Sequence, residues 1–163
     1  MIFVTLGSQK FQFNRLLKKI DELVESGIIK EKVFAQTGYS DYIPMNYMYK
    51  DFLDRDSFSA CQDKCSLEIT HAGTGAIIGA LKKGKKVIAV PRLKKYGEHV
   101  DDHQIQIVEQ FEELGLIYCL KDCRKLAKAI KEVKNMNFNS YVSNTQSYID
   151  DIESYIERCF GNR

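Results

Sequence analysis

The chain alternates short apolar runs with stretches of helical periodicity, and this alternation restricts its fold more than any other feature. Short segments of strand length, most of them rich in apolar residues, occupy residues 2–6, 32–36, 66–70, 86–90 and 117–120. Apolar residues recur at helical spacing in residues 16–24, 57–65, 74–82, 104–114 and 124–133. A strand, a crossover helix and a second strand form the unit of a parallel sheet. The sequence therefore predicts an α/β fold, a Rossmann-like parallel sheet with helices on both faces.

Length and charge limit the classes of function. The 163 residues contain two prolines and no stretch rich in Pro, Gly or Ser that could be a linker, so we expect one domain, residues 1–163. A formal net charge of +2 gives no general electrostatic reason to bind nucleic acid. No segment approaches the roughly 20 apolar residues of a spanning helix, and no export signal is recognisable. We expect a cytoplasmic protein whose anion sites are local.

Five cysteines are an odd number in a chain without an export signal, which favours free thiols. Two close pairs, at positions 61 and 65 and at positions 119 and 123, each have three intervening residues rather than the two usual in zinc knuckles. The cysteines therefore do not favour a metal site.

The last segment predicts an amphipathic helix over residues 140–160. Its apolar positions, interspersed with carboxylates, are Tyr141, Tyr148, Ile149, Ile152, Tyr155, Ile156 and Phe160. The simpler expectation is that this stripe packs on the domain's own sheet. The alternative is that it forms a docking surface for a partner.

The loop from His71 to Gly75 carries the most informative motif. In an open parallel sheet, ligands bind beyond the carboxyl ends of the strands. Two glycines around a hydroxyl let backbone N–H groups approach an anion where the next helix presents its positive end. We predict a phosphate cradle. The alternative is an ordinary tight turn. The motif is neither a Walker loop nor the dinucleotide fingerprint.

A second polar loop covers residues 91–104. It holds two of the three histidines, three carboxylates and three cations, a density that suggests a polar ligand with several hydroxyls. Either Asp101 or Asp102 could instead cap the following helix. Metal binding by His99, Asp101 and His103 is a further alternative, which we do not favour.

Three segments together resemble a known family. Residues 71–75 (HAGTG), 84–92 (GKKVIAVPR) and 95–104 (KYGEHVDDHQ) resemble the C-terminal, donor-binding domain of GT-B glycosyltransferases of family 28. The likeness is greatest to the single-domain subunits of bacterial exopolysaccharide and capsule synthesis (the PssE type). These are similar to the donor subunit of the dolichol-linked N-acetylglucosamine transferase. The resemblance covers almost the whole chain, and residues 95–104 are its most specific part.

The resemblance implies a UDP-sugar as substrate, with no metal and no other cofactor. The residues implied at the donor diphosphate are Gly7, Ser8, His71, Gly73, Thr74 and Gly75. Those implied at the donor sugar are Glu98, His99, Asp102, His103 and Gln104. Many GT-B enzymes bind the ribose through a Glu at the position of Gly79, so this chain must recognise ribose elsewhere.

A GT-B active site lies between two domains, and this chain corresponds to one of them. The resemblance therefore implies a UDP-sugar-binding subunit of a two-component glycosyltransferase that transfers a hexose to a lipid-linked acceptor. A membrane-attached partner would supply the acceptor half and the catalytic base, and would recruit the chain to the inner face of the membrane. We expect residues 92–102 and 140–160 to meet that partner. The alternative is a non-catalytic accessory subunit that enhances a partner glycosyltransferase.

Overall fold

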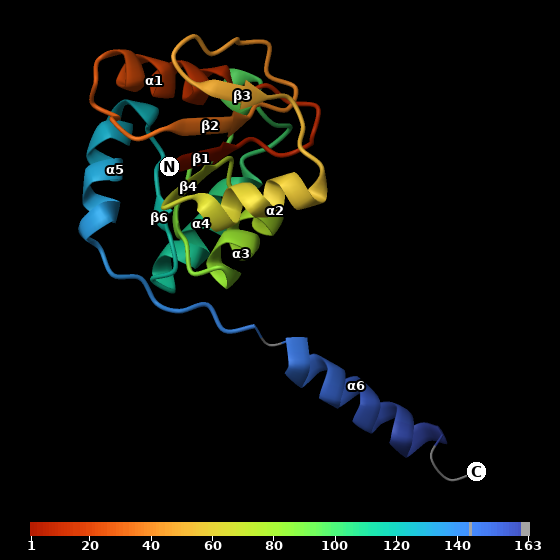
Figure 1. The fold of residues 1–163 in the computed structure, drawn as a ribbon. Helices are drawn as coiled ribbons and strands as arrows, with labels where there is room; N and C mark the ends of the chain where they lie inside the picture. The colour runs from red at the N-terminus through yellow and green to blue at the C-terminus, as the bar shows by residue number, and fades with distance from the viewer. Residues whose placement is uncertain (144, 161–163) are drawn as a thin grey trace.

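The computed structural model of the chain describes residues 1–143 and 145–160. Within these residues, six strands form one parallel sheet in the order β3-β2-β1-β4-β5-β6 (Figure 1). The strands are β1 (Ile2–Thr5), β2 (Val33–Gln36), β3 (Met48–Lys50), β4 (Leu67–Thr70), β5 (Lys86–Ala89) and β6 (Tyr118–Cys119). The direction in which strands are added reverses between β1 and β4, which opens a crevice at their carboxyl ends.

Helices cover both faces of the sheet, which confirms the predicted fold class. One face carries α1 (Asn14–Glu25) and α5 (Leu126–Asn135), which share a core with alternate residues of β1. The other face carries α2 (Arg55–Lys64), α3 (Thr74–Lys82) and α4 (His103–Glu113) (Figure 1). Every residue of β1 and β4 is buried, as expected for central strands that are covered on both sides. Short 3-10 turns lie at η1 (Lys94–Tyr96) and η2 (Cys123–Lys125).

The edge strand β3 was not predicted from the sequence. All three of its residues are exposed, so the segment lacks the buried apolar run by which the other strands were recognised. At the other edge, β6 is shorter than the predicted strand 117–120. The two ends of the sheet are therefore the least regular parts of the pattern.

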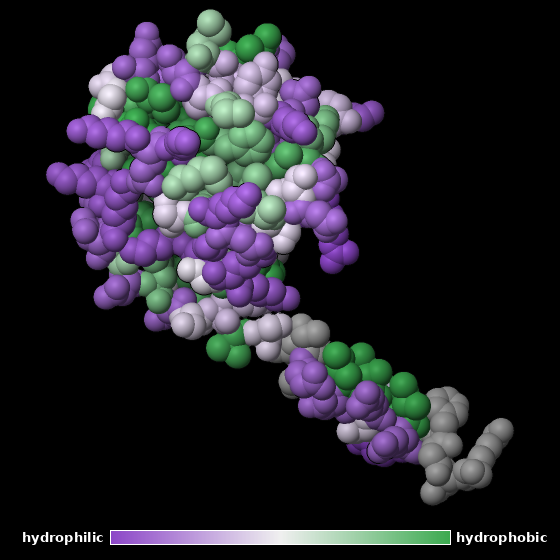
Figure 2. Space-filling model, viewed as in Figure 1, coloured by the Kyte–Doolittle hydropathy of each residue, from purple (hydrophilic) through white to green (hydrophobic). Residues whose placement is uncertain are grey.

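The C-terminal helix, α6 (Thr145–Phe160), extends away from the domain (Figure 1). Residue 144 of the predicted helix and residues 161–163 of the predicted domain lie outside the described residues. Apolar side chains line one side of α6 (Figure 2), with exposed fractions of 41% for Ile149, 58% for Ile152, 61% for Tyr155 and 49% for Ile156. The predicted helix begins at Thr145 rather than at residue 140, and of its predicted stripe Tyr141 packs against the domain core. The side chains of Tyr148 and Phe160 lie outside what the structure describes. For the exposed Ile149, Ile152, Tyr155 and Ile156, the expectation of packing on the domain's own sheet is wrong.

Within the described ranges, no helix has both the length and the hydropathy that a bilayer-spanning segment requires.

Glu68 is a fully buried carboxyl group in the centre of the sheet. Its Oε2 accepts a hydrogen bond of 2.9 Å from Gln62 Nε2, whereas its Oε1 has no partner among residues 1–143 and 145–160. Burial raises the pKa of Glu68 to about 8, although the bond from Gln62 opposes this change. Glu68 is therefore mostly protonated at neutral pH.

Glu68→Gln is expected to remove a loss of stability that the wild type shows as the pH rises toward 8. The pKa of Glu68 in the folded state lies above its ordinary value of 4.5, so between the two values the folded state binds more protons than the unfolded state. The free energy of unfolding then falls as the pH rises, by up to ~2 kcal/mol between pH 6.5 and 8. Urea unfolding at both pH values measures this, with the exposed Glu113→Gln as control. An unchanged pH slope in Glu68→Gln would contradict the assignment.

Candidate functional site

The two predicted phosphate loops lie together at the carboxyl ends of β1 and β4, where the sheet reverses its order. They form a pocket of about 430 Å³. Its lining residues are Thr5, Gly7, Ser8, Gln9, Gln36, Phe58, His71, Gly73, Gly75, Ala76 and Gln104. Five of the six residues implied at the diphosphate and one of those implied at the sugar therefore share one pocket.

The His71 ring separates the two loops. A Cβ atom built at Gly7 would lie 2.5 Å from His71 Nε2, and one built at Gly73 would lie 2.4 Å from the same atom. Gly7 also has a φ of +73°, a conformation that side chains rarely adopt. Both glycines are therefore required where they stand, because the imidazole occupies the space on both sides.

His71 is a neutral spacer rather than a cation. Its Nδ1 lies 3.2 Å from the carbonyl oxygen of Thr5, which can only accept, so the ring proton resides on Nδ1. Burial, reinforced by the charge of Arg92, lowers the pKa of His71 to about 4. At neutral pH its Nε2 therefore carries a lone pair and offers no proton to a phosphate.

The N-terminus of α3 supplies the donors that His71 does not. Gly73 is the N-cap residue and no side chain caps the helix, so the first N–H groups of α3 have no intrahelical partner. Ala72, with a φ of +68°, turns the chain into this helix start. Gly75 and Ala76 line the pocket, whereas Thr74 does not. This uncapped, positive helix end can bind an anion through backbone groups alone.

Two residues of the polar loop are buried and fix its shape. Gln104 lines the pocket, and its Oε1 accepts a hydrogen bond of 3.0 Å from the backbone N–H of Arg92. Glu98 is 1% exposed; its carboxylate accepts from Arg15 Nε at 2.7 Å and from the Leu93 N–H at 2.9 Å. Glu98 therefore braces the loop and does not reach the pocket.

The remaining polar side chains of the loop lie outside this pocket. Asp101, which precedes the N-cap residue Asp102, accepts from the His103 N–H of the first turn of α4 at 3.0 Å, and it also lies 3.1 Å from His99 Nδ1. Asp102 accepts from the Lys94 N–H at 2.9 Å. The role of His99, Asp102 and His103 at the donor sugar stays a prediction. The part of the chain that the structure describes holds no group of three His, Cys, Asp or Glu side chains arranged to bind a metal ion.

Three pocket residues lie outside the loops that the sequence indicated: Thr5, Gln36 and Phe58. Thr5 and Gln36 stand at the carboxyl ends of β1 and β2, a position that could have been used to find them. Phe58 comes from α2, and only the folded chain brings it to the site.

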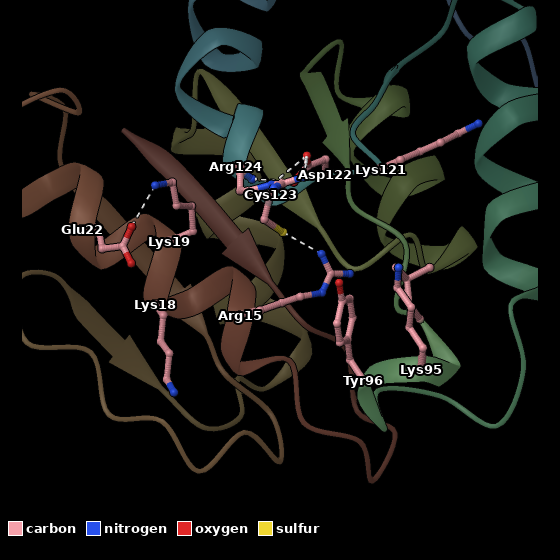
Figure 3. A pocket seen from close by; sticks show the side chains of 11 residues that line it. Arg15, Lys18, Lys19, Glu22, Lys95, Tyr96, Lys121, Asp122, Cys123 and Arg124 are labelled. Carbon is pink, nitrogen blue, oxygen red and sulfur yellow. Dashed lines mark hydrogen bonds and ion pairs between the residues drawn. The ribbon is translucent and has the colours of Figure 1, made fainter.

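A larger hollow of about 660 Å³ lies between α1, η1 and η2 (Figure 3). Most of its charges are paired within it or beside it, as in Lys19 with Glu22 at 2.8 Å and Arg124 with Asp122 at 2.9 Å. Its Arg15 side chain also donates to Cys123 Sγ (Figure 3). Since no residue of the two phosphate loops lines this hollow, we assign the candidate site to the smaller pocket.

Comparisons with known proteins agree with the fold and with the motifs. The human UDP-N-acetylglucosamine transferase subunit ALG13 is 28% identical over 145 residues, which are 77% of this chain and 11% of that protein. The NMR solution structure of ALG13 has a TM-score of 0.60 at 21% identity and covers 90% of this chain and 92% of its own. The calicheamicin glycosyltransferase CalG4 has a TM-score of 0.61 at 17% identity, over 83% of this chain and 34% of its own.

The chain thus spans about a tenth of the length of its human relative. The two solved structures show a shared fold, that of one half of a GT-B glycosyltransferase. The family model for the glycosyltransferase family 28 C-terminal domain matches residues 1–158. With a family match over nearly its whole length and two glycine loops at the sheet's switch point, the chain belongs to the glycosyltransferase family 28 C-terminal domain family.

Proposed function

We propose that this chain is the UDP-sugar-binding subunit of a two-component glycosyltransferase that transfers a hexose to a lipid-linked acceptor in exopolysaccharide or capsule synthesis. The observation that carries the proposal is the pocket in which the uncapped start of α3 and the Gly7 loop meet around His71. The leaving group of the reaction is a nucleoside diphosphate, and a helix N-terminus stabilises its developing charge without a metal ion. The human relative, by its name, is a subunit of a UDP-N-acetylglucosamine transferase.

The proposal includes a membrane-attached partner that supplies the acceptor site and the catalytic base. Two observations support it. The neutral His71 is held by a backbone carbonyl, and the carboxylates of Glu98, Asp101 and Asp102 accept hydrogen bonds from their own loop. These groups are therefore already engaged, which favours a catalytic base on the partner. The apolar side of α6 is exposed and offers a surface for the partner. In this proposal the partner recruits the chain to the cytoplasmic face of the membrane.

Calorimetric titration of the isolated chain with UDP tests the proposal, with UMP and GDP as comparisons. We expect saturable binding of UDP that is weaker for UMP, because the α3 terminus acts on the diphosphate. Transfer from a UDP-sugar to a lipid-linked acceptor should then require both this chain and its partner. Binding of none of the nucleotides, or transfer by the partner alone at the full rate, would contradict the proposal.

The second candidate is a non-catalytic accessory subunit that enhances a partner glycosyltransferase. The observation that favours it is Gly79, which offers no carboxylate to a ribose and whose nearest neighbour is the Gln62 side chain. If the chain is an accessory, Gln104→Ala should leave transfer by the reconstituted pair unchanged. If it binds the donor, the same change should raise the KM for the UDP-sugar.

A further inference from the structure

Arg92 is the largest fully buried side chain of the described residues. Its Nη2 donates to the carbonyl oxygens of Leu6 at 2.7 Å and Phe11 at 3.1 Å. Its Nε and Nη1 have no hydrogen-bond partner within residues 1–143 and 145–160. Arg92 was expected to open a loop that meets the partner, and its burial excludes it from such a surface.

The positive charge of Arg92 is not neutralised by a direct ion pair. No carboxylate of the described residues pairs with it, and Glu98, whose charge acts on it, is bonded to Arg15 and to the Leu93 N–H. Burial lowers the pKa of Arg92 to about 10, so the guanidinium remains charged at neutral pH. A buried cation without a counter-ion costs several kcal/mol unless an anion nearby offsets it.

The surroundings of Arg92 place that charge directly behind the candidate site. The two carbonyls that it binds flank the Gly7 loop on either side. Its own N–H bonds to Gln104, which lines the pocket. Its charge also reaches His71, between the two phosphate loops. Arg92 therefore bonds to two of the elements that enclose the pocket, and its charge acts on a third, His71.

We propose that Arg92 is a positioning residue for the donor, the buried cation that holds the Gly7 loop and Gln104 and attracts the diphosphate of a nucleoside diphosphate. This inference rests on the proposed function. Because Arg92 is fully buried, it acts through the backbone that it binds and through its field, which protein surroundings weaken less than water does. The effect of Arg92 must then grow with the number of phosphates on the ligand.

The test compares calorimetric affinities of uridine, UMP and UDP for the wild-type chain, Arg92→Met and Arg92→Lys. We expect Arg92→Met to weaken UDP binding roughly 10- to 100-fold, UMP binding less, and uridine binding by less than about twofold. Arg92→Lys, which keeps the charge, should recover most of the UDP affinity. The matched control is Arg124→Met, which removes a guanidinium that is 90% exposed and should leave all three affinities unchanged.

The outcomes separate this inference from the proposed function. If the wild-type chain binds none of the three ligands, both fail. If it binds UDP, two results overturn only the role of Arg92. Either Arg92→Met weakens the binding of uridine and of UDP by the same factor, or it weakens the binding of neither. Should Arg92→Met not fold, the side-chain ¹⁵N resonance of Arg92 in the wild type decides: it should shift saturably with UDP and little with uridine. Equal shifts would overturn the inference.

Discussion

Replacing Gly73 with alanine is expected to reduce the affinity of the chain for UDP at least ~10-fold and to destabilise it by ~1–3 kcal/mol. The backbone at Gly73 has a φ of −74°, which alanine adopts freely, so the whole effect is steric. The added methyl group would lie 2.4 Å from His71 Nε2, and the ring is held from its other side by the Thr5 carbonyl. Either the imidazole or the start of α3 must move. Calorimetry with UDP and urea unfolding measure the two effects.

Gly75→Ala is the matched control for stability alone, since a Cβ atom at Gly75 meets no protein atom within 4 Å, but Gly75 itself lines the pocket. Alanine within a helix should raise stability by up to ~1 kcal/mol. The double variant His71→Ala/Gly73→Ala adds a second control. Removing the imidazole should cancel the clash, so the two changes should not be additive. Wild-type stability and UDP affinity in Gly73→Ala would mean that His71 does not separate the loops.

The double change Ile152→Asp/Ile156→Asp is expected to lower transfer by the reconstituted pair ~100-fold or more. Both side chains lie on the exposed apolar side of α6, and the proposed partner would bury them. Losing two buried isoleucines removes ~3–6 kcal/mol of association free energy, before any cost of burying the new charges. UDP binding by the isolated chain should not change, because α6 extends away from the domain (Figure 1) and none of its residues lines the pocket.

The control for this experiment is Ser154→Asp/Arg158→Asp, which adds the same carboxylates to the opposite side of α6. It should leave transfer within about twofold of the wild type, since rim charges contribute little to association. Equal losses in both double variants would indicate that any acidic change on α6 is harmful. Wild-type transfer by the partner together with the Ile152→Asp/Ile156→Asp variant would exclude this helix face as the docking surface.

The central part of the fold was predictable because its buried strands are short and rich in apolar residues, as in residues 2–6 and 86–90, and alternate with segments of helical periodicity. The edge strand β3 was not, because long-range hydrogen bonds position the segment that leads to it. Asp21, on α1, accepts from the Tyr42 hydroxyl at 2.6 Å, the Met45 N–H at 2.9 Å and the Asn46 N–H at 2.8 Å. No local pattern reveals a carboxylate that organises residues more than twenty positions away.

In the candidate site, too, features set by local sequence could be predicted and features set by long-range contacts could not. That Gly7, His71 and Gly73 line one pocket could be predicted, because glycine directly after a strand permits a sharp turn and a close approach of the backbone to a ligand. The buried roles of Glu98 and Arg92 could not, since a charged residue in a polar loop is expected at the surface. The buried Glu98 carboxylate is paired with Arg15, which lies 83 residues earlier in the chain, and no local pattern reveals that partner.

The shared imidazole also limits the order in which this site can change over generations. A larger residue at position 73 is tolerated only after His71 has been replaced with something smaller, because the two occupy the same space. In the reverse order, the chain would first carry a larger residue at position 73 together with His71, and the clash between them would destabilise it. Variants of this chain that have already lost His71 can therefore accept new side chains at the N-terminus of α3, where the proposed function places the donor.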